Sequence, residues 1–222
     1  YINKGEGVFE RIDVPALEHD RITQALLALD FDNSGTVDIA VLRRGPRMPE
    51  NGDPELFLNT GVDEAGVPQF VRHNSRDFRS SDNDTFSSES LIAGFFDDNF
   101  FYDLFSTNGQ GLKPNEGPRH LFINATINDN EAVIVKLEPG ESNRDALGAK
   151  VWLRDREGTL LGYREVFYQG RNQLNARKVH FGLGPKESLA TPLRAYIRWP
   201  SGTEQEARVN PGKVVSVSEE VK

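Results

Sequence analysis

The sequence contains no cysteine and has only four histidines among its 222 residues. Without cysteine the chain can form no disulfide and no thiolate metal site, and it has no thiol nucleophile. The histidines lack the spacing of metal-dependent hydrolases, and no GxSxG nucleophile elbow or phosphate-binding glycine loop is present. Acidic pairs such as Asp97 and Asp98 could serve glycoside hydrolysis, but any acidic protein offers such pairs. We therefore expect that the chain is not an enzyme.

Long apolar runs and helical patterns are also missing. No apolar run approaches the roughly 18 residues of a membrane-spanning helix, so we expect no transmembrane segment. No stretch has a 3.6-residue apolar rhythm, and the run from Asp20 to Leu29 leads into an aspartate turn, as a buried strand does. Short apolar segments separated by turn residues predict an all-β fold.

Positive charge is scarce, with 26 Lys and Arg against 34 Asp and Glu and a net charge of −8. This balance argues against nucleic acid or an anionic membrane as a partner. Residues 1–131 hold 11 Lys and Arg against 23 Asp and Glu, whereas residues 132–222 hold 15 against 11. The change of sign predicts two domains, 1–131 and 132–222, of which the acidic one could hold cations.

The acidic half contains an internal repeat. Residues 1–9, 56–61 and 121–126 each carry an apolar strand that ends in Asn, and residues 26–41 and 91–105 each have the pattern of strand, acidic turn, strand. Together these elements give about four strands per unit, as in a propeller blade. Residues 1–131 are therefore predicted to be a partial β-propeller of about two blades plus a strand.

The second half has a different pattern, in which short strands recur about every ten residues. The expected strands are 132–137, 149–154, 159–166, 177–183, 195–199, 206–209 and 214–218. Turn residues separate them, and this spacing is typical of a β-sandwich or barrel. We expect a small, sandwich-like β domain here.

The first acidic turn has the pattern of a calcium loop. It offers side-chain oxygens at loop positions 1, 3, 5 and 9, which are Asp30, Asp32, Ser34 and Asp38. Gly35 at position 6 allows a sharp turn, and the carbonyl of Thr36 can supply the oxygen of position 7. Calcium takes about six to eight hard oxygen ligands from such a loop, so we predict Ca²⁺ here. An aspartate-rich hairpin turn that holds no metal is the alternative.

The second acidic turn is a degenerate copy. It keeps Asp97, Asn99 and Asp103, but Phe95 replaces the first aspartate and Phe100 replaces the glycine. These three residues form a weaker candidate metal site. The favoured interpretation is an ordered turn without metal, in which the phenylalanines of residues 95–101 are buried.

Two known families resemble this chain. Residues 30–38 resemble the calcium loop of FG-GAP/VCBS repeats, and residues 56–61 resemble the strand that closes such a blade. Residues 142–151, 180–184 and 198–202, in that order, are similar to motifs of the ASPIC/UnbV domain, which follows such repeats in cartilage acidic protein and in many bacterial secreted proteins. The resemblance implies extracellular or periplasmic placement, calcium-stabilised folding and binding to partners, with no established catalytic residues.

The predicted propeller has few blades, and the chain starts at Tyr1 and not at Met. A closed propeller of this type needs about seven blades, so we expect a processed or truncated product completed by another protein subunit or by the missing part of a longer chain. The chain is predicted to be a binding or structural module within a larger assembly. The alternative is a carbohydrate-active or accessory biosynthetic protein that uses the propeller as a ligand platform.

Several residues of the second half have an expected structural role, and some of them also have an alternative role in binding. His180 lies inside an apolar strand and is expected to be structural, with Phe181 on the inner face and glycines that permit close backbone approach. Trp152 and Trp199 are expected to pack in the core, and a sugar-stacking surface is the alternative. Asp145 is expected to form a turn, and the alternative is an exposed ligand contact.

Overall fold

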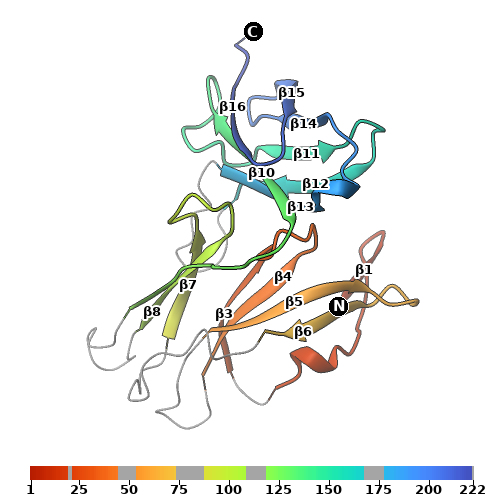
Figure 1. Cartoon of the computed structure of the whole chain (residues 1–222), viewed down its shortest axis with the longest axis vertical. Coiled ribbons are helices and arrows are strands. Elements are labelled where there is room, and N and C mark those ends of the chain that lie inside the picture. The colour runs from red at the N-terminus through yellow and green to blue at the C-terminus, as the bar shows by residue number, and fades with distance from the viewer. Residues whose placement is uncertain (20–21, 45–53, 74–87, 109–118, 168–177, 222) are drawn as a thin grey trace.

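The computed structural model describes residues 1–19, 22–44, 54–73, 88–108, 119–167 and 178–221 (Figure 1). The described elements are strands apart from two single-turn 3-10 helices, η1 (Pro15–Leu17) and η3 (Lys186–Ser188). Neither of these turns, nor any other helix in the described residues, could cross a bilayer. The all-β prediction is confirmed, and the sheets of the described residues do not close into a barrel.

The first half of the chain folds into antiparallel meanders. A separate hairpin, β1 (Ile2–Gly5) and β2 (Val8–Glu10), begins the chain. The first meander is β3 (Ile22–Leu29), β4 (Asp38–Arg44), β5 (Pro54–Val62) and β6 (Pro68–Arg72). The second is β7 (Ser88–Gly94), β8 (Asp103–Asn108) and β9 (His120–Phe122). The strand, acidic turn, strand pattern is therefore confirmed in both copies.

The two meanders repeat the same hydrogen bonds at a spacing of 65 residues. The second strand of each unit begins with a buried aspartate, Asp38 or Asp103. In both units its Oδ2 accepts the backbone N–H of the residue seven positions earlier at 2.7 Å. Its Oδ1 accepts the backbone N–H of an asparagine, Asn59 or Asn124, at 2.8 Å. The repeat that the sequence indicates is thus also a repeat of backbone geometry.

The meanders pack together through their first strands, because β7 contacts β3 and β4. Their shared core consists of Leu27, Leu29, Phe31, Ala40, Leu42, Leu56, Leu91, Tyr102 and Leu104. Side-by-side meander sheets are the arrangement of neighbouring propeller blades. In Figure 1 the two sheets lie below the C-terminal part, with their acidic turns directed toward it.

The second half of the chain is a β-sandwich. Its strands are β10 (Asn130–Glu138), β11 (Lys150–Arg154), β12 (Leu160–Glu165), β13 (Lys178–Pro185), β14 (Leu193–Arg198), β15 (Glu204–Val209) and β16 (Lys213–Ser218). One sheet has the order β13-β10-β16 and the other β12-β11-β14-β15. Buried side chains from both sheets form one core. All seven predicted strands are present.

The expected burial of the phenylalanines in the second acidic turn is wrong for Phe96. Its side chain is 53% exposed, and those of Phe95, Phe100 and Phe101 are only partly buried. The reason is that Tyr102 fills the core position at this turn and stacks on Phe95 at a ring-centroid distance of 4.5 Å. Phe100 takes the left-handed conformation that Gly35 has in the first copy, with φ of 67° against 88°.

Candidate metal centre

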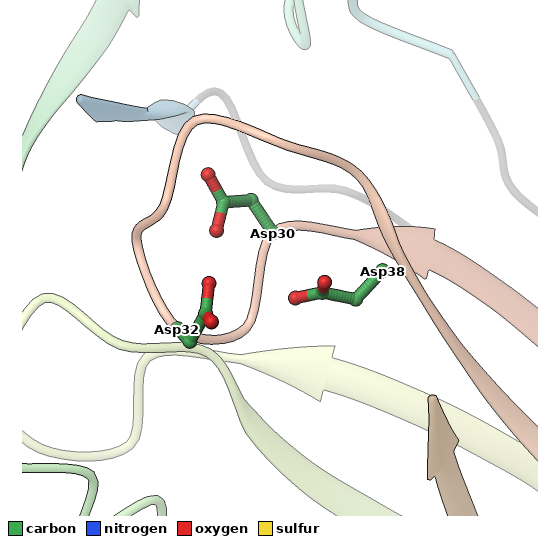
Figure 2. A group of neighbouring side chains, drawn as sticks. All are labelled: Asp30, Asp32 and Asp38. Atoms are coloured by element: carbon green, nitrogen blue, oxygen red, sulfur yellow. The ribbon is translucent and has the colours of Figure 1, made fainter. Parts of the chain in front are cut away.

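Three carboxylates converge in the first acidic turn. Oxygen atoms of Asp30, Asp32 and Asp38 lie within 4.8 Å of one another. Figure 2 shows Asp30 and Asp32 pointing into the curl of the loop, and Asp38 pointing toward the segment that joins them. In the described part of the chain, this is the one group of three or more His, Cys, Asp or Glu side chains that could hold a metal ion. Asp30 and Asp38 are fully buried, and Asp32 is partly buried.

Backbone N–H groups hold all three carboxylates in place, and those of Phe31 and Asn59 hold Asp38. Asp30 accepts N–H donors from Ser34 at 3.1 Å and Gly35 at 2.9 Å. Asp32 accepts the same Ser34 N–H at 3.0 Å. The curled backbone needs the left-handed region at Asn33, with φ of 60°, and at Gly35. Hydrogen bonds within the protein therefore give the loop the curled shape that a cation site requires.

Burial makes the carboxylates costly to ionise. Desolvation raises the pKa of Asp30 to about 7, and the neighbouring charges of Asp38 and Asp32 add to this, while the Gly35 N–H opposes it. Desolvation likewise raises the pKa of Asp38 to about 6 against the N–H donors of Asn59 and Phe31. Two buried negative charges so close together favour a cation between them.

The two other predicted ligands lie in the same loop. The hydroxyls of Ser34 and Thr36 are 2.7 Å apart, and the Thr36 hydroxyl donates to the carbonyl of Asn59 at 2.9 Å. The structure thus places all five predicted residues in one turn, with the three carboxylates convergent and the two hydroxyls joined to each other.

The second turn is less suited to a metal. Asn99 is exposed, and its amide donates to the carbonyl of Asn124 at 2.7 Å while its oxygen accepts the N–H of Phe101 at 2.9 Å. Asp97 accepts the N–H of Asn99 at 3.2 Å. Among described residues no group of three metal-binding side chains forms around Asp103. A metal at Asp97, Asn99 and Asp103 stays a prediction, as does the interpretation of an ordered turn without one.

The first acidic turn packs directly against strand β13 of the sandwich. A Cβ atom placed on Gly182 would lie 2.0 Å from Oδ2 of Asp30 and 2.7 Å from Cα of Asn33. The N–H of Gly184 donates to the carbonyl of Asn33 at 2.8 Å. His180 Nε2 lies 2.9 Å from Oδ1 of Asn33. The candidate metal loop is therefore also the contact between the two halves of the chain.

His180 is a buried structural residue in this contact. Burial lowers its pKa to about 3, and the nearby positive charge of Arg164 acts in the same direction. Its ring packs against Tyr102 at 4.8 Å and Phe95 at 5.5 Å, measured between centroids. A neutral, enclosed imidazole fits the expected structural role. The sequence signal for the contact, two glycines alternating with apolar residues, indicates close approach but does not say to what.

A second anchor was missed by sequence reasoning. The buried carboxylate of Glu219 accepts the N–H groups of Gly140 at 2.7 Å and Ser142 at 2.9 Å, together with the hydroxyl of Ser201 at 2.5 Å. It thereby joins two of the three segments that carry the ASPIC/UnbV resemblance. Only an acidic residue near the end of the last strand signals it in the sequence.

The tryptophans and Asp145 lie away from the metal loop. Trp199 is in the sandwich core, as expected, and its indole N–H donates to Gln205 at 2.7 Å. Core packing is wrong for Trp152, which lies partly buried on the outer face of β11, because the flanking Val151 and Leu153 take the inner positions. Asp145 is partly buried in the turn before β11, next to Ala146 with a φ of 53°.

Comparison with known proteins gives one family match, which is confined to residues 139–222. No protein of curated function was found to match the chain. The comparisons give no support to the FG-GAP/VCBS resemblance of residues 1–131, which stays a prediction. Residues 139–222, which begin just after β10, match the family model described as ASPIC and UnbV, a non-catalytic type of domain.

Proposed function

We propose that the chain is a non-catalytic, calcium-stabilised binding or structural module. In this proposal one Ca²⁺ in the loop of residues 30–38 fastens the meander sheets to the sandwich. The observation that carries it is the convergence of Asp30, Asp32 and Asp38 within 4.8 Å of one another, in a loop that packs against Gly182.

The chemistry of the donor set suits a hard divalent cation. The three aspartates would bind through carboxylate oxygens, with the Ser34 hydroxyl and the Thr36 carbonyl as further oxygen ligands. Each carboxylate oxygen has two lone pairs, so an oxygen that accepts a backbone N–H can still bind an ion. No sulfur or imidazole ligand belongs to the set, which favours Ca²⁺ over zinc.

A positive charge among Asp30, Asp32 and Asp38 would offset the free-energy cost of burying ionised carboxylates where the two halves meet. A bound Ca²⁺ supplies charge that compensates the buried carboxylates. Asp30 would then remain ionised while it packs against Gly182, and Asn33 would keep its bonds to His180 and Gly184. Because the ion binds the folded loop alone, it stabilises the folded chain by a free energy that rises with the logarithm of its concentration above the Kd.

We place this module outside the cytoplasm, in an extracellular or periplasmic setting. The support is the family resemblance together with the candidate calcium loop of residues 30–38. Calcium sites with a Kd of about 10⁻⁴–10⁻³ M are typical of extracellular modules.

We further propose that the chain works within a larger assembly. The β1–β2 hairpin leaves Tyr1, Val8 and Phe9 exposed by 83%, 59% and 59%. The Gly5 N–H donates to Asn3 Oδ1 at 2.9 Å, and the Gly61 N–H donates to Asn59 Oδ1 of β5 at the same distance. The hairpin therefore corresponds to the outer strands of a meander unit. Another protein subunit, or the remainder of a longer chain, would cover these side chains. Nucleic acid is not an expected partner at a net charge of −8.

Calorimetric titration with Ca²⁺ tests the metal proposal. Asp32→Asn removes one charge but keeps an oxygen that can accept the Ser34 N–H, so it should weaken binding at least tenfold without unfolding the loop. Asp97→Asn makes the same change in the second turn and is the matched control, with no expected effect. Absence of Ca²⁺ binding to the unmodified chain at millimolar concentration, or equal binding by the Asp32→Asn variant, contradicts the proposal.

A further inference from the structure

The outer face of the sheet β12-β11-β14-β15 carries a row of aromatic side chains. Trp152 is directly opposite Tyr163 in β12 and Tyr196 in β14, so the three rings share one face. Tyr163 and Tyr196 are 40% and 38% exposed, and the Trp152 and Tyr163 ring centroids are 5.3 Å apart. Each tyrosine forms a side-chain hydrogen bond with a glutamate. Tyr163 donates to Glu165 at 2.9 Å, and Tyr196 is hydrogen-bonded to Glu206. The rings are therefore held in place while exposed to solvent.

A row of arginines runs beside the aromatic row. Arg154 is opposite Arg194, and Arg194 is opposite Arg208, on three adjacent strands. Like charges placed directly opposite one another destabilise a sheet. Arg194 has an ion pair with Glu206, whereas in the part of the chain that the structure describes no carboxylate pairs with Arg154 or Arg208. Such a row is unfavourable in the free protein and favourable when an anionic ligand lies over it.

Next to these rows lies a shallow pocket of about 400 Å³. Its lining includes Trp152, Tyr196, Arg154, Arg198 and Glu204. The guanidinium of Arg198 lies 5.9 Å from the centre of the Trp152 ring and bonds Glu204 at 2.6 Å. The pocket therefore offers an apolar ring face, hydrogen-bond donors and carboxylate acceptors side by side.

We propose that this face binds a uronate-bearing glycan. A sugar ring has an apolar C–H face that stacks on an aromatic ring, and hydroxyls at its edge that both donate and accept hydrogen bonds. Arginine recognises the carboxylate of a uronate in a bidentate manner. Carboxylates such as Glu204 accept bonds from sugar hydroxyls, whereas nucleic-acid phosphates offer only acceptors and would be repelled. The mixture of arginine and glutamate thus favours a glycan over a nucleic acid.

The site goes beyond the proposed function and does not depend on it. It lies on the outer face of the sandwich sheet, whereas the metal loop packs against β13 of the other sheet. Charge supports the choice of ligand, because residues 132–222 hold 15 Lys and Arg against 11 Asp and Glu in a chain whose net charge is −8. The ligand platform is thus expected on the sandwich and not on the meander sheets.

Calorimetric titration of the full chain with three hexasaccharides of uronate type tests the proposal. The probes are oligogalacturonate, oligoguluronate and hyaluronan, and the comparison ligands are cellohexaose and a hexathymidylate. At least one uronate probe should bind, and both comparison ligands should bind at least tenfold more weakly. Binding should also weaken as the salt concentration rises, because exposed arginines make the ionic contacts.

Variants connect the binding to this face. Tyr196→Ala should weaken binding of the uronate probe about tenfold, as should Arg154→Gln combined with Arg208→Gln. The matched controls are Phe96→Ala and Arg11→Gln, which change exposed side chains outside the sandwich and should leave binding unchanged. No binding of any uronate probe at millimolar concentration, equal loss in the controls, or tighter binding of cellohexaose or hexathymidylate overturns the proposal.

Discussion

Gly182 in β13 and Asp30 in the first acidic turn approach so closely that a Cβ atom on the glycine would lie 2.0 Å from a carboxylate oxygen. The two residues belong to different halves of the chain and are separated by more than 150 positions. Their contact lies at the junction between the meander sheets and the sandwich.

Replacing Gly182 should separate the two halves. Gly182→Ala overpacks the contact with Asp30 and Asn33, so we expect a loss of about 1–3 kcal/mol in the free energy of unfolding together with weaker Ca²⁺ binding. Urea unfolding with and without Ca²⁺ measures both effects. Gly94→Ala is the control, because the atoms nearest to its added Cβ belong to the exposed ring of Phe96, the first at 3.2 Å. Equal stability of the two variants would count against the junction.

A comparison of variants at Asp38 and Asp103 distinguishes the structural role of this aspartate from metal binding. Each accepts two backbone N–H groups at equivalent positions of its own repeat, so Asp38→Asn and Asp103→Asn should each cost about 1–3 kcal/mol in calcium-free buffer. Only Asp38→Asn should lower the calcium content measured by elemental analysis. Loss of a bound ion in Asp103→Asn would show that the second turn also holds metal.

Glu219 should make stability depend on acidic pH. Burial alone would raise its pKa, but hydrogen bonds from Ser201, Ser142 and Gly140 outweigh burial and lower it to about 2 from a usual value of 4.5. Because the folded pKa is the lower one, this contribution is present above pH 4.5 and is lost as the pH falls toward 2.

The measurement is the free energy of unfolding between pH 6 and pH 2.5. Glu219→Gln should remove part of the acid sensitivity, whereas Glu220→Gln at the exposed neighbouring position should keep it. An identical pH dependence in the Glu219 variant and the unmodified chain would rule out this anchor.

Phe181 should be a principal contributor to the sandwich core. Its side chain is 1% exposed, so Phe181→Ala should cost about 3–5 kcal/mol. Phe167→Ala, at a position 46% exposed, should cost far less. Thermal unfolding followed by tryptophan fluorescence compares the two, and a variant at position 181 as stable as the parent would show that the ring is not in the core.

Local patterns predicted much of this structure. The short apolar segments between turn residues in 132–222 predicted all seven strands of the sandwich, and the 65-residue repeat predicted two matching turns. Side chains alternate between the two faces of a strand, which places Trp199 on the inner face with Ile197 and Trp152 on the outer face between Val151 and Leu153. The alternation of side chains along β11 was thus a sequence signal that Trp152 lies on the outer face of the sheet.

The junction could not be predicted from these patterns. Whether Asn33 reaches His180 depends on how two separately folded sheets dock, and no periodicity in the chain encodes that docking. The outward position of Phe96 follows similarly from Tyr102, which fills the core from the end of the same turn.

The two tryptophans can report directly whether Ca²⁺ fastens the two halves of the chain together. Both lie in the sandwich, whereas the candidate calcium loop lies in the other half of the chain. If Ca²⁺ fastens the two halves together, tryptophan-detected thermal unfolding should show one transition whose midpoint is higher in millimolar Ca²⁺ than in EDTA. An identical tryptophan-detected midpoint in Ca²⁺ and in EDTA would show that Ca²⁺ does not fasten the two halves together.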